Sequence, residues 1–245
     1  WMADRDAKLV KKMTKKELRA AWATLIGRQI PAFKDIEREK VDEFKRDGYI
    51  EFLDILRLKK HGEVLPVVSL YPTGVEWNKK VAIGIMGEGK DSLFDEDGDP
   101  VEPVRRMLDA GYSVVSADLF QQGEFLKGGQ SLTQTRKVAN PREYAGYSFG
   151  YNHTLFAHRV HDILTLVAWV SGFDEEKPES VYLVGVEGAG PWVVAARALV
   201  GAAVDKVAIE TQGFRFAELK SYRDPNFIPG AVKYGDVPGL LSLAD

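Results

Sequence analysis

The sequence predicts an α/β fold with a mainly parallel sheet and helices on both of its faces. Short apolar runs have the length and composition of buried strands, and helical patterns separate them along the chain. Strands that alternate with helices usually form one parallel sheet, because each helix returns the chain to the same edge. The predicted strands are residues 80–86, 112–119, 181–186 and 204–211, and the predicted helices are residues 101–110, 156–170 and 192–200.

The N-terminal part has a different pattern. We expect a helical extension at residues 1–38 and a single globular unit at residues 39–245, because apolar residues recur at helical spacing to about residue 28. The basic run at residues 8–16 is interpreted as one solvated helix face, in preference to a nucleic-acid or membrane arm. Two alternating runs, residues 49–56 and 65–72, are joined by a short polar loop and predict an antiparallel strand pair.

A long connection with little periodicity occupies residues 120–150. Loops of this length are usually functional or disordered. Hydrogen-bonding and aromatic side chains favour an ordered surface that could bind a sugar-like ligand, and a cover packed over the sheet is an equal alternative. The pocket residues predicted from this loop, from strand ends and from the helix at residues 192–200 are Asp118, Gln121, Gln122, Glu124, Arg136, Tyr147 and Trp192.

The helix predicted at residues 156–170 has an apolar stripe, with Arg159 and Asp162 expected on its other faces. His158 and His161 are three residues apart and can be neighbours on a helix. A histidine pair without a third ligand is a weak indication of a metal site. We therefore expect one ring to form a polar contact and the other to meet solvent, with no metal and no cofactor.

The most informative turn is where the strand at residues 181–186 runs into Glu187-Gly188-Ala189-Gly190 and then a helix rich in alanine and valine. Small residues are needed where a turn is strained and a strand and helix approach closely. A strand, a tight small-residue turn and a helix are the context of a nucleophile elbow, G-x-S-x-G or a close variant. Glu187 occupies the position of the serine.

With these segments in order, residues 40–243 resemble an α/β-hydrolase of the acetyl xylan esterase-like group, which is related to dienelactone hydrolases. The resemblance implies a nucleophile at position 187 and an oxyanion hole from backbone N–H groups of Gly188, Gly87 and Glu88. It also implies ester hydrolysis as the ancestral reaction and a small ester or saccharide-like ligand as the partner.

The chain departs from that pattern. Glutamate replaces serine at position 187, and no histidine follows His161, so the order serine, acid, histidine cannot be completed. The final strands of the group are also missing after the run at residues 204–211. Because an open sheet edge needs a cover or partner, we expect a truncated chain, a missing C-terminal segment or self-association.

Three roles are open for Glu187. As a covalent nucleophile it would need a histidine-activated water to break its ester intermediate, and it is one methylene longer than the aspartate of related enzymes. As an acid or base it would be stabilised in its charged form by the helix N-terminus. The favoured interpretation is the third role, in which Glu187 is a hydrogen-bonded carboxylate in a site that has lost its catalytic chemistry.

The predicted function is thus that of an esterase-like domain with weak or no activity, a pseudoenzyme. The alternative is a non-catalytic carbohydrate- or ligand-binding accessory domain.

Two other motifs suggest alternatives to the elbow as the functional site. Gly146-Tyr147-Ser148-Phe149-Gly150 matches G-x-S-x-G, but it follows a polar loop instead of a strand; His153 could still pair with Ser148. The glycines at 185, 188 and 190, with Glu210 further on, resemble a dinucleotide-binding turn. Their spacing is G-x-x-G-x-G, and Glu187 would repel the pyrophosphate.

Composition narrows the classes of partner. Apolar residues at 45% and charged residues at 28% are ordinary for a globular protein, and a net charge of −3 gives no reason to expect nucleic acid or an anionic membrane. No apolar run approaches a membrane span. The lack of cysteine excludes disulfides and thiol nucleophiles. No signal peptide opens the chain, and from its Trp1-Met2 start we expect a mature product, secreted or periplasmic in preference to cytoplasmic.

Overall fold

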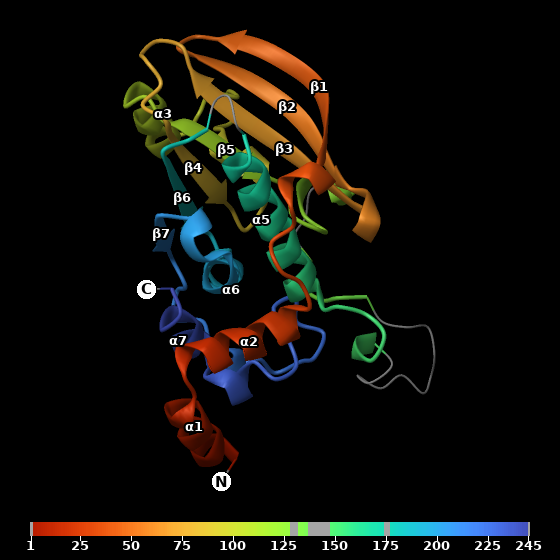
Figure 1. Cartoon of the computed structure of the whole chain (residues 1–245). Helices are drawn as coiled ribbons and strands as arrows, with labels where there is room; N and C mark the ends of the chain where they lie inside the picture. The colour runs from red at the N-terminus through yellow and green to blue at the C-terminus, as the bar shows by residue number, and fades with distance from the viewer. Residues whose placement is uncertain (1, 128–131, 137–147, 174–176, 245) are drawn as a thin grey trace.

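A seven-stranded mixed sheet with the order β1-β2-β3-β5-β4-β6-β7 runs through the chain (Figure 1). The computed structural model describes residues 2–127, 132–136, 148–173 and 177–244. The strands are β1 (Glu37–Arg46), β2 (Tyr49–Leu58), β3 (Glu63–Pro72), β4 (Lys80–Ile85), β5 (Ser113–Ala117), β6 (Ser180–Gly185) and β7 (Lys206–Ile209). The helices are α1 (Met2–Lys12), α2 (Lys15–Ile26), α3 (Glu102–Asp109), α5 (Leu155–Ser171), α6 (Gly190–Val200) and α7 (Asp236–Leu241).

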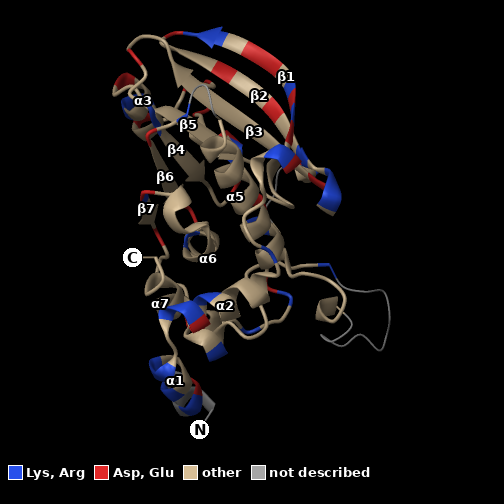
Figure 2. Cartoon of the chain, in the orientation of Figure 1, with Lys and Arg blue, Asp and Glu red and all other residues tan. Residues whose placement is uncertain are grey.

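The sheet has an antiparallel part and a parallel part. β1, β2, β3 and β5 pair antiparallel in that order, and β5, β4, β6 and β7 pair parallel. The predicted antiparallel pair is therefore confirmed as β2 and β3, and β1 extends it by one strand. β1 is an edge strand on which charged residues of both signs follow one another (Figure 2). Such charges discourage pairing with another chain.

Helices cover both faces of the sheet, as the sequence predicts. Val67 and Val115 pack in the larger core with α5 and α6, whereas Val68 and Val114 pack in a smaller core with α3. Since successive side chains of a strand point to opposite faces, the two cores lie on opposite sides of the sheet. Figure 1 shows α5 and α6 on one side and α3 on the other.

α5 is buried around almost its whole circumference. Arg159 and Asp162, expected on faces other than the apolar stripe, are also buried and only 3% and 4% exposed. The helix packs against α6 and α2 as well as the sheet. The loop after β5 closes another face, where Asp162 Oδ2 accepts a hydrogen bond from the Phe120 backbone N–H over 2.6 Å.

The N-terminal helices pack on the C-terminal segment. Thr14 and Glu17 form a capping box at the start of α2, and Gly27 ends that helix in the left-handed conformation. The Trp22 side chain is fully buried in the larger core and donates its indole N–H to the Tyr234 carbonyl over 3.1 Å. Within the described ranges, no helix combines the length and apolar character that a membrane crossing requires.

Candidate functional site

The turn between β6 and α6 has the geometry of a nucleophile elbow. Glu187 lies at φ +55°, in the left-handed region that non-glycine residues rarely adopt, and Gly188 follows at φ +93°. Strain of this kind is held in place by surrounding structure and is concentrated at functional sites. The Glu187 side chain is exposed and forms no hydrogen bond or ion pair with the described residues.

Small residues are required on both sides of this turn. A β-carbon at position 185 would lie 2.7 Å from a methyl group of Val193, and one at position 190 would overlap the carbonyl oxygen of Glu210. The strand, the helix and the next strand therefore approach too closely for larger residues. This is the close packing that the sequence predicts at the elbow.

The loop after β4 lies directly beside the elbow. A β-carbon at Gly87 would overlap the carbonyl oxygen of Glu187, and the Val186 N–H donates to the Ile85 carbonyl over 3.2 Å. The backbone segments predicted to form an oxyanion hole, Gly188 with Gly87 and Glu88, are thus brought to one place at the carboxyl ends of β4 and β6. An oxyanion hole requires this juxtaposition of backbone groups.

Two predicted pocket residues are buried supports of this loop. Gln122 is fully buried, donates its amide N–H groups to the carbonyls of Met86 and Gly87, and accepts from the Leu119 N–H. Asp118 is fully buried and accepts from the backbone N–H groups of Lys90 and Glu124. Both side chains hold the loops after β4 and β5 together, and neither lines the 500 Å³ cavity described below.

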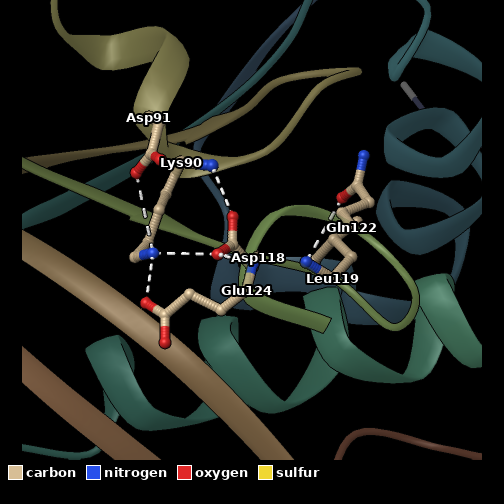
Figure 3. A network of polar contacts seen from close by, with 6 residues as sticks. All are labelled: Lys90, Asp91, Asp118, Leu119, Gln122 and Glu124. Atoms are coloured by element: carbon tan, nitrogen blue, oxygen red, sulfur yellow. Dashed lines mark hydrogen bonds and ion pairs between the residues drawn. The ribbon is translucent and has the colours of Figure 1, made fainter. Parts of the chain in front are cut away.

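Lys90 completes this support and was not singled out from the sequence. Its ammonium donates to Asp118 Oδ2 over 2.8 Å and to Glu124, and Figure 3 shows it between carboxylates from both loops. Burial opposes its charge, but the hydrogen bonds with Asp118 and Glu124 outweigh burial and raise the pKa of Lys90. The Glu124 side chain is 63% exposed. In the sequence, this ion pair is indicated by a lysine in the loop after one predicted strand and an aspartate at the end of the next predicted strand.

A cavity of about 500 Å³ lies between the loop after β5 and the start of α5. Gln121, Arg136, Ser148 and His153, all named from the sequence, line it together. Tyr147 lies outside the described residues. Glu187 is not among the lining residues, so the elbow and this cavity are separate features.

The cavity wall combines rings with polar groups. Phe120, Phe149 and Tyr222 contribute aromatic surface, and the Asn152 amide joins the polar side chains already named. The Phe149 ring contacts the Tyr222 ring at a centroid distance of 6.4 Å and the Phe227 ring at 5.3 Å. A cavity of this size, mainly apolar with a few polar groups, is typical of small-ligand sites.

Trp192 is buried beneath the elbow and does not line the cavity. Its indole N–H donates to Asn226 over 2.6 Å, and the guanidinium of Arg159 lies 4.3 Å from its ring centroid. Arg159 donates to the carbonyls of Phe120 and Gln121, both over 3.3 Å. Burial lowers the pKa of Arg159 to about 10, although Asp162 and Glu88 oppose the shift. Arg159 therefore connects the elbow helix to the cavity wall, a role that no sequence pattern indicated.

Ser148 and Phe149 are in helical conformation. Its side chain and that of His153 line the same cavity, and a reactive Ser148–His153 pair stays a prediction.

All four histidines of the chain lie within the described residues, and none is hydrogen-bonded to Glu187. The rings of His153, His158 and His161 cluster at centroid distances of 5.0 to 5.8 Å. His161 forms a polar contact with the Ile26 carbonyl, and His158 is half-buried. The elbow carboxylate therefore has no histidine partner from this chain.

Solved structures of esterases share this architecture, whereas no protein-family profile matches the chain and no curated protein matches its sequence. A Bacteroides fragilis protein to which acetyl xylan esterase activity is ascribed superposes with a TM-score of 0.69 and 14% identity, over 94% of this chain. Acetyl xylan esterase 1 from Thermoanaerobacterium sp. gives 0.55 and 16%, over 93% of this chain and 79% of that one. A glucuronoyl esterase from Solibacter usitatus gives 0.58 and 15%, over 97% and 73%.

At these identities the likeness concerns the fold. The chain spans 64% of the length of the Bacteroides fragilis protein, so the neighbours also contain segments with no counterpart here. The strand order, the elbow between β6 and α6 and these superpositions agree with one another. The chain therefore has an α/β-hydrolase-like fold, which it shares with solved structures of acetyl xylan and glucuronoyl esterases.

Proposed function

We propose that this chain is a hydrolase-fold domain that binds a small saccharide-like or ester ligand and has weak or no esterase activity by itself. The observation that carries the proposal is the exposed carboxylate of Glu187 at the strained elbow position, without a histidine partner. The fold retains the scaffold of an esterase, and the group that would attack the ester is changed.

The chemistry argues against efficient turnover. Acyl transfer by the serine mechanism needs a hydroxyl activated by a base within hydrogen-bonding distance. A carboxylate that attacked the ester carbonyl would form a mixed anhydride and expel an alkoxide, a much poorer leaving group than the carboxylate unless an acid protonates it, and none of the four histidines of this chain bonds to Glu187. The backbone groups suited to an oxyanion remain in place, which is compatible with ligand binding without reaction.

The 500 Å³ cavity supports the binding part of the proposal. Aromatic rings that pack on the faces of sugars and amide or guanidinium groups that bond hydroxyls and carbonyls meet in one space of about 500 Å³. The structural neighbours are named as acetyl xylan and glucuronoyl esterases. We therefore propose acetylated or uronic saccharides as the first ligands to test.

Hydrolysis of p-nitrophenyl acetate tests the catalytic part. We expect the native chain to match the buffer rate, and Glu187→Gln to behave in the same way. Turnover by the native chain that disappears in Glu187→Gln would show a working carboxylate and overturn the proposal. Turnover that survives Glu187→Gln but disappears in Ser148→Ala would also overturn it, because it would place the reaction at Ser148.

Calorimetric titration with acetylated xylo-oligosaccharides tests the binding part. We expect saturable binding by the native chain that is lost in Phe149→Ala and weakened in Arg136→Ala. Tyr151→Ala is the matched control, because this nearby ring is 87% exposed and does not line the cavity. The binding part fails if no titrated saccharide binds or if the Tyr151 variant loses as much affinity as the Phe149 variant.

A further inference from the structure

Three potential metal ligands converge at one end of α5, from parts of the chain far apart in sequence. Glu63 begins β3, and His158 and His161 lie three residues apart in the first turns of α5. Each offers one donor atom, and these atoms all lie within 4.8 Å of one another. Nδ1 of His161 is 3.8 Å from Oε1 of Glu63.

The hydrogen bonding of His161 fixes its tautomer. Its Nε2 lies 2.6 Å from the carbonyl oxygen of Ile26, the last residue of α2. A carbonyl can only accept, so Nε2 carries the hydrogen and donates it. A metal ion binds the neutral form of the ring, in which only one nitrogen carries a hydrogen. Its Nδ1 is then an acceptor with a free lone pair.

That lone pair is buried and faces another acceptor. Nδ1 of His161 is inaccessible and has no hydrogen-bond partner among the described residues. It faces the carboxylate oxygen Oε1 of Glu63 over 3.8 Å, and an ionised carboxylate cannot donate a hydrogen bond. A buried acceptor that faces a carboxylate oxygen, here on a Glu63 side chain that is 14% exposed, is unfavourable unless a cation or a donor lies between them.

We propose that Glu63, His158 and His161 bind a divalent transition-metal ion, with Zn²⁺ as the best match. Two imidazoles and one carboxylate are a known zinc donor set, with a fourth position left for water. A histidine that binds metal usually donates its other ring N–H to a backbone carbonyl or carboxylate, which fixes its orientation. The bond from His161 to Ile26 has this form. The proposal does not depend on the proposed function.

The donors need only a modest contraction around an ion. With metal–ligand bonds of about 2.0 to 2.1 Å, tetrahedral donors lie about 3.4 Å apart, compared with 3.8 Å between His161 and Glu63. His158 is half-buried and at the helix surface, so its ring can turn toward the pair. His158 also lines the 500 Å³ cavity, which places the ion beside the cavity wall.

Arg28 competes with the ion for Glu63. Its guanidinium forms an ion pair with the other carboxylate oxygen, Oε2, and leaves Oε1 directed to His161. The positive charge opposes a second cation nearby. This competition gives a test with a predicted increase in affinity, which general damage to the fold would not produce.

The test uses the full chain, stripped with a chelator and titrated with Zn²⁺ by calorimetry and with Co²⁺ by visible absorption. We expect one saturable site, a rise in melting temperature on adding Zn²⁺, and the intense visible bands of four-coordinate Co²⁺. Glu63→Gln and His158→Ala should each abolish saturable binding, with circular dichroism used to confirm the fold. These two positions carry the test if the fully buried His161→Ala variant does not fold.

His61→Ala is the matched control, because this histidine is exposed and does not belong to the donor group. It should keep the native affinity, and Arg28→Gln should bind Zn²⁺ at least about tenfold more tightly. The proposal is overturned if the native chain shows no saturable binding, if binding survives Glu63→Gln and His158→Ala, or if His61→Ala removes it. Unchanged or weaker Zn²⁺ binding by Arg28→Gln would place the ion away from Glu63 and would also overturn the proposal.

Discussion

The carbonyl oxygen of Glu187 packs against the α-carbon of Gly87, so closely that a β-carbon at position 87 would overlap it. This contact joins the elbow after β6 to the loop after β4. Glu187 is thereby held at φ +55° by a neighbouring backbone as well as by its own turn. The two backbone segments from which an oxyanion hole would be built are therefore held in direct contact.

We expect Gly87→Ala to destabilise the fold by about 3 kcal/mol, at the upper end for overpacking, because the obstructing atom is backbone and cannot rotate away. Gly74→Ala is the control: a β-carbon there would make an ordinary contact of 3.5 Å with Gly48. Urea denaturation of both variants measures the difference. Equal losses of unfolding free energy in the two variants would contradict a close backbone contact at Gly87.

The strain at the elbow predicts a substitution that stabilises the protein. Glycine adopts φ +55° without penalty, so Glu187→Gly should increase the free energy of unfolding by about 1 kcal/mol after the entropy cost of glycine. Glu210→Gly, at an exposed position without positive φ, should instead lose about 0.5–1 kcal/mol. Thermal melting compares the stability of the two variants. A lower melting temperature for Glu187→Gly than for the native chain would mean that the carboxylate itself supports the turn.

The fold could be predicted because its signals are local. The apolar runs that become β4, β5 and β6 alternate with helices, and the small residues between Gly185 and Gly190 mark the close approach of strand and helix. The edge strand β1 was harder to identify, because its sequence is charged and lacks the apolar alternation of β2, with which it pairs.

The site could be predicted less well, because its contacts depend on tertiary packing. Arg159 lies outside the apolar stripe predicted for α5, yet α6 and the loop after β5 enclose it. Glu63 is 95 positions before His158 by residue number, so no local spacing could reveal that they share a site. Asp118 was correctly placed at a strand end, but only the structure shows that Lys90 neutralises it.

Gln122 offers a test of how the loop after β4 is held. Its side chain bonds two carbonyls of that loop and the Leu119 N–H while fully buried. Gln122→Met keeps the volume but leaves these groups without partners, so we expect a loss of about 2–4 kcal/mol. Faster amide hydrogen exchange at residues 86–90 should accompany it. Gln121→Met, at the half-buried neighbouring position, is the control and should cost less.

The Lys90–Asp118 pair predicts both a stability change and its pH dependence. Lys90→Met leaves a fully buried carboxylate without its cation and should cost about 3–5 kcal/mol at neutral pH. Lys79→Met removes the exposed ion pair with Glu179 and should cost at most about 1 kcal/mol. Because the folded-state pKa of Lys90 is raised above 10.5, its contribution is fully present below that pH and is lost as the pH rises through the folded-state pKa. Urea midpoints measured into the alkaline range should therefore fall more steeply for the native chain than for Lys90→Met, and parallel curves would show that the ammonium is not the stabilising charge.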